Sequence, residues 1–551
     1  MPSTSAWRIA KTEAVGERAM VVADDPHATR AGVRALEDGG NAVDAAIAAA
    51  FVMGVAEPLT SGVGGVATMV LRTPDGRVTV IDGSTVAPRA AREDMFELVD
   101  AGGRSGMYGW PMAKDDANNV GWRAVGVPGM VAACLYALER YGTLPRERIL
   151  EDAIALAEQG RVVDWYLGLA IGTYAYRLLR FPGSKRIFFR PEGAPLRVAT
   201  GFEPADRLVQ PDLARVLREI ARGGADAFYR GDVAAEIARD VQANGGILTR
   251  EELAAYEPRE VAPLRSSYRG VDLFTIAGPG GGTTAVEILN LLEGFDLRRT
   301  PQGSAAELHL VAEASRRAFA DRFAHLADVP GAPFERLASK EWARTRAIDP
   351  ARATPDEGPG RVSHDPDRTT NICVVDGEGR MVTLTSTLGG AFGACVVPKG
   401  TGVVLANVMT WFDPRPGTIN SAAPGKRILW APSPTVLLRD GRPFACVGAP
   451  GGRRIMSAVP QTIVHLVDHG DGPQDAVSRP RVHCEGRETM VDSRFPTGVL
   501  DELARMGHEL ALKDETFFSA NFARPGAIVV KDDGTLRGGV NVFKPAIATG
   551  L

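Results

Sequence analysis

The feature that most constrains the fold is a change in composition and hydrophobic periodicity about two thirds of the way along this 551-residue chain. Residues 351–368 (ARATPDEGPGRVSHDPDR) are rich in proline, glycine and charge, which predicts an exposed, flexible segment. Directly after it, TTNICVVDGEGRMVTLTST alternates in two runs around an Asp-Gly-Glu-Gly turn, a pattern typical of a β-hairpin. SPTVLLRDGRPFACVGAPGG repeats this design around RDGR, so residues 369–551 are predicted to be rich in strands.

The part before this boundary is predicted to be rich in helices. Apolar residues at helical spacing predict helices within 25–55, 212–228, 233–246, 283–294 and 305–326. The second helix within 25–55 is alanine-rich with few large side chains, so it is expected to pack closely and to be buried. The chain is therefore of mixed α/β class, with a helix-rich part, 1–368, and a strand-rich part, 369–551.

Composition excludes several classes of function. With 45% hydrophobic residues, 24% charged residues and a formal charge of -4, the chain lacks the basic excess expected of a nucleic-acid or anionic-membrane binder. It has neither a signal-peptide core nor a membrane-spanning apolar run, which predicts a cytoplasmic protein. The five cysteines are scattered without a CxxC pair, so free buried thiols are expected, not disulfides or a cysteine-zinc site.

Three motifs mimic cofactor sites without completing one. SGVGGVAT (61–68) and GPGGGTT (278–284) lack both the Gly-Lys-Ser/Thr ending of a phosphate loop and the full GxGxxG context of a dinucleotide fold. His465 and His469 stand one helical turn apart in HLVDH, but HExxH is not formed and no third ligand is evident, so two structural histidines near a helix end are favoured. Neither a cofactor nor a metal is predicted.

Two further motifs have a simple structural explanation when each is read alone. GAPGGRR (448–454) lies between a strand pattern and a helix pattern, and its paired glycines leave backbone N–H groups suited to an oxyanion hole, with a tight turn as the alternative. The doubled threonine Thr369-Thr370 begins the strand-rich part, where two β-branched residues could simply start a strand.

These pieces occur together with others, in one order along the chain. The motifs are TSGVGG (60–65), YGTLP (141–145), LVQPDLARVLREIARGGADAFYRG (208–231), AFADR (318–322), TTNICVVD (369–376), TLGGAFG (387–393), NVMTWFD (407–413), APSPT (431–435) and GAPGG (448–452). In this order the sequence resembles the γ-glutamyltranspeptidase family of N-terminal-nucleophile hydrolases, over nearly the whole chain.

The resemblance implies a four-layer αββα sandwich and a precursor that cuts itself between Arg368 and Thr369. The new N-terminal Thr369 would be the nucleophile, and its free α-amine, with a pKa near roughly 8, would be the general base. Thr387 matches the threonine that hydrogen-bonds the nucleophile, and Gly451 and Gly452 match the oxyanion-hole donors. The two fragments would remain together as a heterodimer acting on a small-molecule amide.

The donor pocket departs from the family pattern. Where the family carries polar side chains that hold a γ-glutamyl group, this chain has Ser84 in place of an arginine, Gly389 in place of an asparagine, Val408 and Trp411 in place of a glutamine and an aspartate, and Trp430 and Ala431 in place of paired serines. A glutamyl zwitterion would lose its partners there, at several kcal/mol. Arg123, in VGWRAVGVPG, is a candidate partner for a substrate carboxylate, with a surface salt bridge as the alternative.

The sequence thus predicts a self-processing threonine amidohydrolase or acylase with an acyl donor other than ordinary γ-glutamyl, similar to the family's cephalosporin acylases and oxamate amidohydrolases. Two rivals stay open: a γ-glutamyltransferase or glutathione hydrolase, and an unprocessed, non-catalytic relative that acts as a binding protein.

Overall fold

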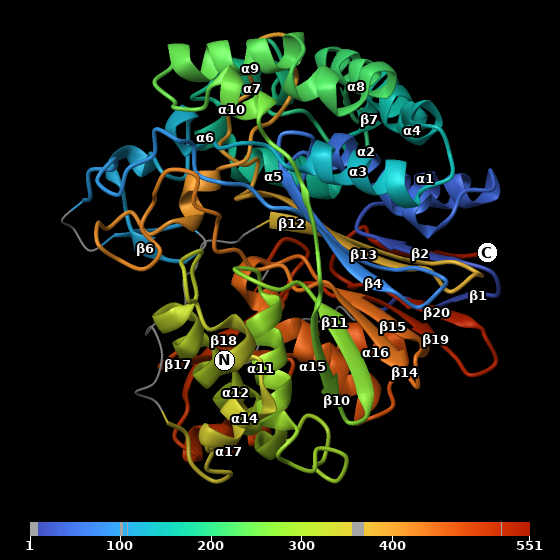
Figure 1. The fold of residues 1–551 in the computed structure, drawn as a ribbon, viewed down its shortest axis with the longest axis vertical. Helices are drawn as coiled ribbons and strands as arrows, with labels where there is room; N and C mark the ends of the chain where they lie inside the picture. The colour runs from blue at the N-terminus through green and yellow to red at the C-terminus, as the bar shows by residue number, and fades with distance from the viewer. Residues whose placement is uncertain (1–8, 100–102, 107, 355–367, 520) are drawn as a thin grey trace.

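Two seven-stranded sheets lie face to face between two layers of helices (Figure 1). The structure, a computed structural model, describes residues 9–99, 103–106, 108–354, 368–519 and 521–551. All strand pairs within these two sheets are antiparallel. The predicted four-layer αββα sandwich is confirmed.

The first sheet carries the doubled threonine on its third strand. Its order is β21 (Ile547–Gly550), β2 (Met20–Ala23), β12 (Arg368–Val375), β13 (Met381–Gly389), β3 (Val66–Arg72), β4 (Val78–Gly83) and β9 (Arg259–Val261). The second sheet has the order β1 (Ala14–Gly16), β20 (Leu536–Gly539), β19 (Gly526–Val530), β15 (Arg442–Gly448), β14 (Thr435–Arg439), β11 (Val271–Thr275) and β10 (Leu264–Tyr268). Residues before and after the predicted cleavage point therefore contribute strands to both sheets.

The helical layer over the first sheet, drawn at the top of Figure 1, comes from the first half of the chain. It contains α1 (Pro26–Glu37), α2 (Ala42–Ala56), α3 (Met130–Tyr141), α4 (Arg146–Gln159), α5 (Trp165–Thr173), α6 (Ala175–Leu178), α7 (Pro182–Phe188), α8 (Pro211–Tyr229), α9 (Asp232–Ala243) and α10 (Arg250–Ala254). Every residue of α2 is buried, as its small side chains predict, and Gly54 lies so close to Gly62 that no side chain fits between them.

The layer over the second sheet combines segments from both parts of the chain. It contains α11 (Gly282–Leu292), α12 (Ala305–His325), α13 (Phe334–Leu337), α14 (Lys340–Thr345), α15 (Ile455–Val467), α16 (Pro473–Ser478) and α17 (Thr497–Arg505). Beside it lies a small sheet of β16 (Val482–Cys484), β17 (Glu488–Asp492) and β18 (Glu509–Lys513). The remaining elements are short. Two pairs of two-residue strands are present: β5 (Arg104–Ser105) with β6 (Trp110–Pro111), and β7 (Arg161–Val162) with β8 (Arg207–Leu208). The 3₁₀ turns are η1 (Lys114–Asp116), η2 (Trp122–Ala124), η3 (Val408–Trp411) and η4 (Gly452–Arg454).

The helices and hairpins expected from sequence periodicity are present. The five helical patterns correspond to α1 with α2, α8, α9, α11 and α12. The hairpins are β12–β13 and β14–β15, and Asp440 and Gly441 between the latter have φ angles of 51° and 74°. Two consecutive positive φ angles are the signature of the turn that matches the twist of a two-residue hairpin.

The segment before Thr369 needs one correction. Residues 355–367 lie outside the described residues, but Arg368 at its end is buried, not exposed. Its guanidinium stacks on the ring of Phe518, 4.2 Å from the centroid, and donates to the Phe518 carbonyl. An arginine can be buried in this way because its planar cation is satisfied by an aromatic face and a carbonyl together.

The expected free thiols are confirmed, because all five cysteines are buried and unpaired. In the part of the chain that the structure describes, no helix is long and apolar enough to span a bilayer.

Candidate active site

The two threonines of the pair point to opposite faces of β12 and do different work. Alternation along a strand sends neighbouring side chains to opposite faces. Thr369 lies opposite Thr387 of β13, whereas the Thr370 hydroxyl donates to Asp24, which follows β2. The register shifts between Arg368 and Thr369, so that Arg368 lies opposite Gly389. This irregularity sits at the peptide bond where cleavage is predicted.

The hydroxyl of Thr387 makes three hydrogen bonds, and the chemistry of the three partners determines in which of them Thr387 is the donor. It lies 2.7 Å from the carbonyl oxygen of Arg368, 3.2 Å from Oγ1 of Thr369 and 2.8 Å from the amide nitrogen of Gly389. A hydroxyl has one proton and two acceptor positions. Only the carbonyl is unable to donate, so Thr387 donates to Arg368 and accepts from Thr369 and Gly389.

This arrangement is suited to the self-cleavage expected at this bond. Thr387 accepts from the Thr369 hydroxyl and donates to the Arg368 carbonyl, so an attack of that hydroxyl on that carbonyl would find its proton already held and the carbonyl already polarised. Thr369 is only 5% exposed and Thr387 3% exposed, so both hydrogen bonds act away from bulk water, where electrostatic effects are stronger.

A buried charge network, which the sequence did not reveal, anchors the start of β12. Asp24 accepts from the Thr370 hydroxyl and from the amide of Asn371, and it pairs with Lys544 at 3.1 Å. Lys544 also pairs with Glu57 at 3.0 Å, and the pKa of Lys544 is raised by these two carboxylates against the opposing effect of burial. These residues are far apart in the sequence, so no local pattern could have indicated them.

The glycine turn after β15 has the geometry that only glycine adopts readily. Gly451 has φ 140° and Gly452 has φ 57°, and a side chain on Gly451 would collide with Ala523. β15 brings this turn to the nucleophile strand, because Gly448 packs directly against the side chain of Asn371, two residues after Thr369. The Gly451 and Gly452 amides thus belong to a turn that leads from the core of the site into η4 and α15.

The other two glycine clusters are positions of close backbone approach. A side chain on Gly65 would lie 2.6 Å from the Thr387 carbonyl, and one on Gly281 would lie 2.1 Å from the Ala431 carbonyl. The first cluster therefore holds the end of β13, and the second holds the loop that carries Trp430.

Two buried indoles lie beside Gly389, at the end of the strand that carries Thr387. Gly389 has φ 92°, and a side chain there would meet Asn407 at 2.1 Å and the Trp411 ring at 3.3 Å. The Trp411 ring in turn lies edge-on to that of Trp430, with centroids 6.5 Å apart. The asparagine that the family pattern would place at position 389 thus fits neither the backbone nor the space beside Trp411.

The remaining predicted pocket residues divide into two groups. Val408 and Ala431 are fully buried, and the Val408 side chain packs against Gly126. Ser84, 2% exposed at the end of β4, accepts a 3.2 Å hydrogen bond from the guanidinium of Arg427. Strand β4 is next to β3, which is next to β13, so Ser84 lies along the same end of the sheet as Thr387.

Arg123 lies in η2, which packs against η3, the turn that carries Val408 and Trp411. Its exposed side chain donates to the Met95 carbonyl and stacks on the Phe96 ring at 5.3 Å. A role as a partner for a substrate carboxylate stays a prediction.

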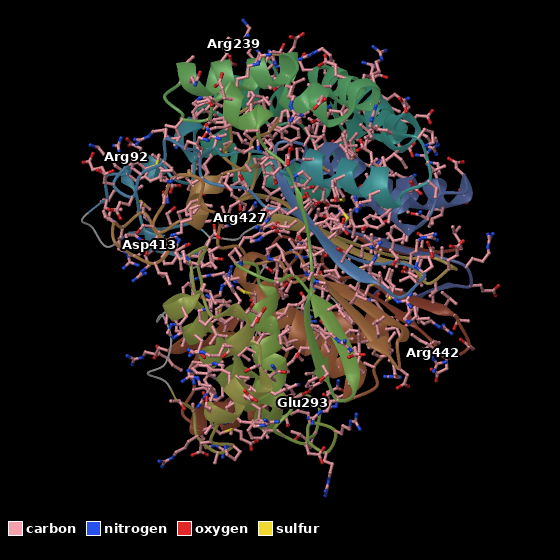
Figure 2. All side chains as sticks on the ribbon, viewed as in Figure 1. Arg92, Arg239, Glu293, Asp413, Arg427 and Arg442 are labelled. Carbon is pink, nitrogen blue, oxygen red and sulfur yellow. The ribbon has the colours of Figure 1, made fainter. Side chains whose placement is uncertain are left out.

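Arg427, which sequence reasoning did not select, is the cation that reaches Ser84. In the described part of the chain no carboxylate lies within 4.0 Å of its guanidinium, whereas Arg259 nearby pairs with Asp82. Burial and the charge of Arg259 lower the pKa of Arg427. Its position in KR, three residues before Trp430, was the signal available in the sequence. Figure 2 shows Arg427 between the upper and lower helical layers.

The fold and this site together define the class of protein: a four-layer amide hydrolase of the N-terminal-nucleophile type. Residues 28–548 match the model of the gamma-glutamyltranspeptidase family. The chain belongs to the γ-glutamyltranspeptidase family, as the order of its motifs predicted.

The similar proteins include both acylases and a glutathione hydrolase. An acylase ACY 1 proenzyme of Pseudomonas sp. (strain V22) is 37% identical over 98% of this chain and 94% of its own length. The glutathione hydrolase proenzyme of Escherichia coli (strain K12) is 35% identical over 95% of this chain and 90% of its own. The crystal structure of cephalosporin acylase from Bacillus halodurans has a TM-score of 0.87 at 27% identity and covers 100% of this chain and 99% of its own.

Proposed function

We propose that this self-processing acylase of the γ-glutamyltranspeptidase family hydrolyses an amide whose acyl part lacks the α-amino group of γ-glutamate. The observation that carries the proposal is the continuous contact from Thr369 through Thr387 and Gly389 to Trp411. We take the apolar Trp411 indole to border the donor site, where an ammonium group would need an acidic partner. The kinship with acylase proenzymes supports this choice.

In the first step the precursor processes itself. The Thr369 oxygen attacks the Arg368 carbonyl carbon, the C–N bond to Thr369 breaks, and the released amine takes the proton that the hydroxyl gives up. Water then cleaves the resulting ester, leaving a carboxylate on Arg368 and a free hydroxyl and amine on Thr369.

In turnover the same oxygen attacks the substrate amide, with the Thr369 amine as base. The proton passes to the leaving amine, and water hydrolyses the acyl-threonine to regenerate the enzyme. We assign Thr387 to orient the nucleophile and the Gly451 and Gly452 amides to stabilise the tetrahedral oxyanion.

We further assign Arg427 to the distal end of the acyl group. The half-buried guanidinium of Arg427 makes no ion pair within 4.0 Å in the described part of the chain, although the charges of Asp82 and Asp328 act on it. It lies next to Ser84, at the end of the sheet that carries Thr387, and is suited to pair with a substrate carboxylate. A dicarboxylic half-amide of glutaryl type has such a carboxylate and lacks the α-amino group.

Side-by-side kinetics test the donor. Processed enzyme should cleave glutaryl or oxamate-type amides with a kcat/KM far above that for a γ-glutamyl anilide, because polar mismatch in a buried site commonly reduces this ratio by ~10⁴. A γ-glutamyl value equal to or above all the others would establish the glutathione hydrolase alternative, which the Escherichia coli relative keeps open.

A variant pair tests Arg427. Arg427→Gln should lower kcat/KM for a glutaryl amide by about 10- to 100-fold and leave an uncharged acyl amide of equal length unaffected, since a charge-assisted hydrogen bond contributes about 1.5–3 kcal/mol. Arg442→Gln, the same change at an exposed arginine on the opposite side of the view in Figure 2, is the control. Equal losses on both substrates would assign Arg427 to structure instead of recognition.

A further inference from the structure

The fold brings a third possible ligand, absent from the HLVDH motif itself, next to its two histidines. His465 lies on the last turns of α15, and His469 follows the helix end. Glu307, from the first turn of α12, lies 2.7 Å from Nε2 of His469. One ligand atom from each of Glu307, His465 and His469 lies within 4.8 Å of the others.

Glu307 is a buried carboxylate without a permanent positive partner. Its side chain is 3% exposed, and it accepts from the Gly303 amide and contacts His469. No lysine or arginine in the described part of the chain lies within 4.0 Å of it. The neighbouring carboxylates differ in this respect, because Asp468 pairs with Arg269 and Asp471 pairs with Arg479. Glu307 therefore has His469 as its charge partner in place of a lysine or arginine.

The cluster lies beside open space. The His465 ring is buried, and the side-chain amide of Gln302, which also donates to Asp471, donates to its Nδ1 at 3.1 Å. A cavity of about 230 Å³, lined among others by Gln302, Glu307 and His465, adjoins the cluster and leaves room for a water ligand.

We propose that Glu307, His465 and His469 bind a divalent transition-metal ion, Zn²⁺ by ligand preference, at the end of α15 opposite the glycine turn. Two imidazoles and one carboxylate with an open position form a known zinc ligand set. Glu307 and His469 must move apart by about 0.5 Å to admit an ion at normal bond lengths. The site is structural, since the 13 residues of α15 separate it by about 20 Å from η4.

A second cluster shows what an unsuitable site looks like. His309, Glu313 and His508 also bring their ligand atoms within 4.8 Å of one another. There Glu313 already pairs with both Arg316 and Arg317, so the local charge opposes a cation. The His309 Nδ1 and His508 Nε2 atoms are instead hydrogen-bonded at 2.8 Å.

Metal titration of chelator-treated, processed enzyme tests the proposal. Calorimetry should show one Zn²⁺ bound per molecule, and Co²⁺ should give the intense visible bands of four- or five-coordinate geometry. His465→Gln, His469→Gln and Glu307→Gln should each weaken binding by about 100-fold or more, beyond the roughly 10- to 100-fold typical of outer partners. The control is His325→Gln, the same change at a histidine of α12 outside the cluster, and this variant should bind Zn²⁺ like the wild type.

A thermal-stability measurement separates loss of the metal site from loss of folding. Zn²⁺ should raise the Tm of the wild type but not of the His469→Gln protein, because only a native-state site stabilises by mass action. Circular dichroism and turnover of the variants should match the wild type. The absence of saturable binding, a six-coordinate Co²⁺ spectrum, or equal binding by all variants would overturn the proposal, and none of these results depends on which amide the enzyme cleaves.

Discussion

At the scale of single residues, the site depends on one hydroxyl proton. Thr387 has a single proton and three neighbours, and the geometry leaves the Arg368 carbonyl as its acceptor. In the proposed mechanism the side chain is thus both a polariser of the bond to be cut and a hydrogen-bond acceptor for the nucleophile. Valine at this position keeps the β-branched shape and removes only these interactions.

Thr387→Val is therefore expected to slow both self-cleavage and turnover by about 10²-fold or more, the effect of losing one preorganised donor. Gel densitometry of the precursor and steady-state kinetics measure the two rates. Thr387→Ser should be close to the wild type. Thr385→Val is the control, because this hydroxyl on the same strand contacts Asn371 instead. Full activity in Thr387→Val would remove Thr387 from the mechanism.

The base proposed for turnover is also a single group, the Thr369 amine. It acts only when neutral, so kcat/KM should rise with pH through a value near 8, the ordinary pKa of an α-amine. Pre-steady-state and steady-state profiles between about pH 5.5 and 9.5 check this expectation. A rate independent of pH across this range would mean that another group takes the proton.

At the scale of elements, the ends of α2, β2 and the C-terminal segment meet under β12 through Glu57, Asp24 and Lys544. Burial raises the pKa of Glu57 to about 7, with Lys544 opposing this shift and Asp25 and Asp24 adding to it. The folded protein then keeps a proton on Glu57 at pH values where the unfolded chain has lost it. This group therefore stabilises the fold below its ordinary pKa of 4.5, and that contribution is lost as the pH rises to about 7.

Glu57→Gln should flatten this part of the pH dependence. Urea unfolding of the single-chain Thr369→Ala background at pH 5 and pH 8 would show a smaller loss of unfolding free energy for the glutamine variant. The exposed Glu37→Gln on α1 should leave the slope unchanged. If Glu57→Gln and the parent lose the same stability between the two pH values, Glu57 is ionised throughout.

At the scale of the whole molecule, cleavage cannot separate the two parts, because strands from both alternate in both sheets. β12 and β13 lie between β2 and β3, and the run of β20, β19, β15 and β14 lies between β1 and β11. Fragments 1–368 and 369–551 should therefore separate on a denaturing gel but elute together in native chromatography. Thr369→Ala should remain one chain.

N-terminal sequencing of the smaller fragment decides the cleavage point. A first residue other than Thr369, or cleavage that persists in Thr369→Ala, would contradict the assignment. Dissociation of the fragments under native conditions would contradict the interlocked arrangement of the sheets.

The sequence by itself determined the parts that depend on neighbours along the chain. The two hairpins, the alanine-rich buried helix and the strand start at Thr369 follow from periodicity and turn residues within about ten positions. The order of motifs determined the family, and replacements such as Gly389 and Trp411 indicated a changed donor pocket.

Only the tertiary structure decided which distant groups meet. It joined Asp24 to Lys544, put Arg427 on Ser84, turned the Arg123 side chain onto Met95 and Phe96, and gave His465 and His469 a carboxylate from α12. These contacts link residues up to hundreds of positions apart, and their energies depend on burial and charge balance in a shared interior, which local periodicity does not encode.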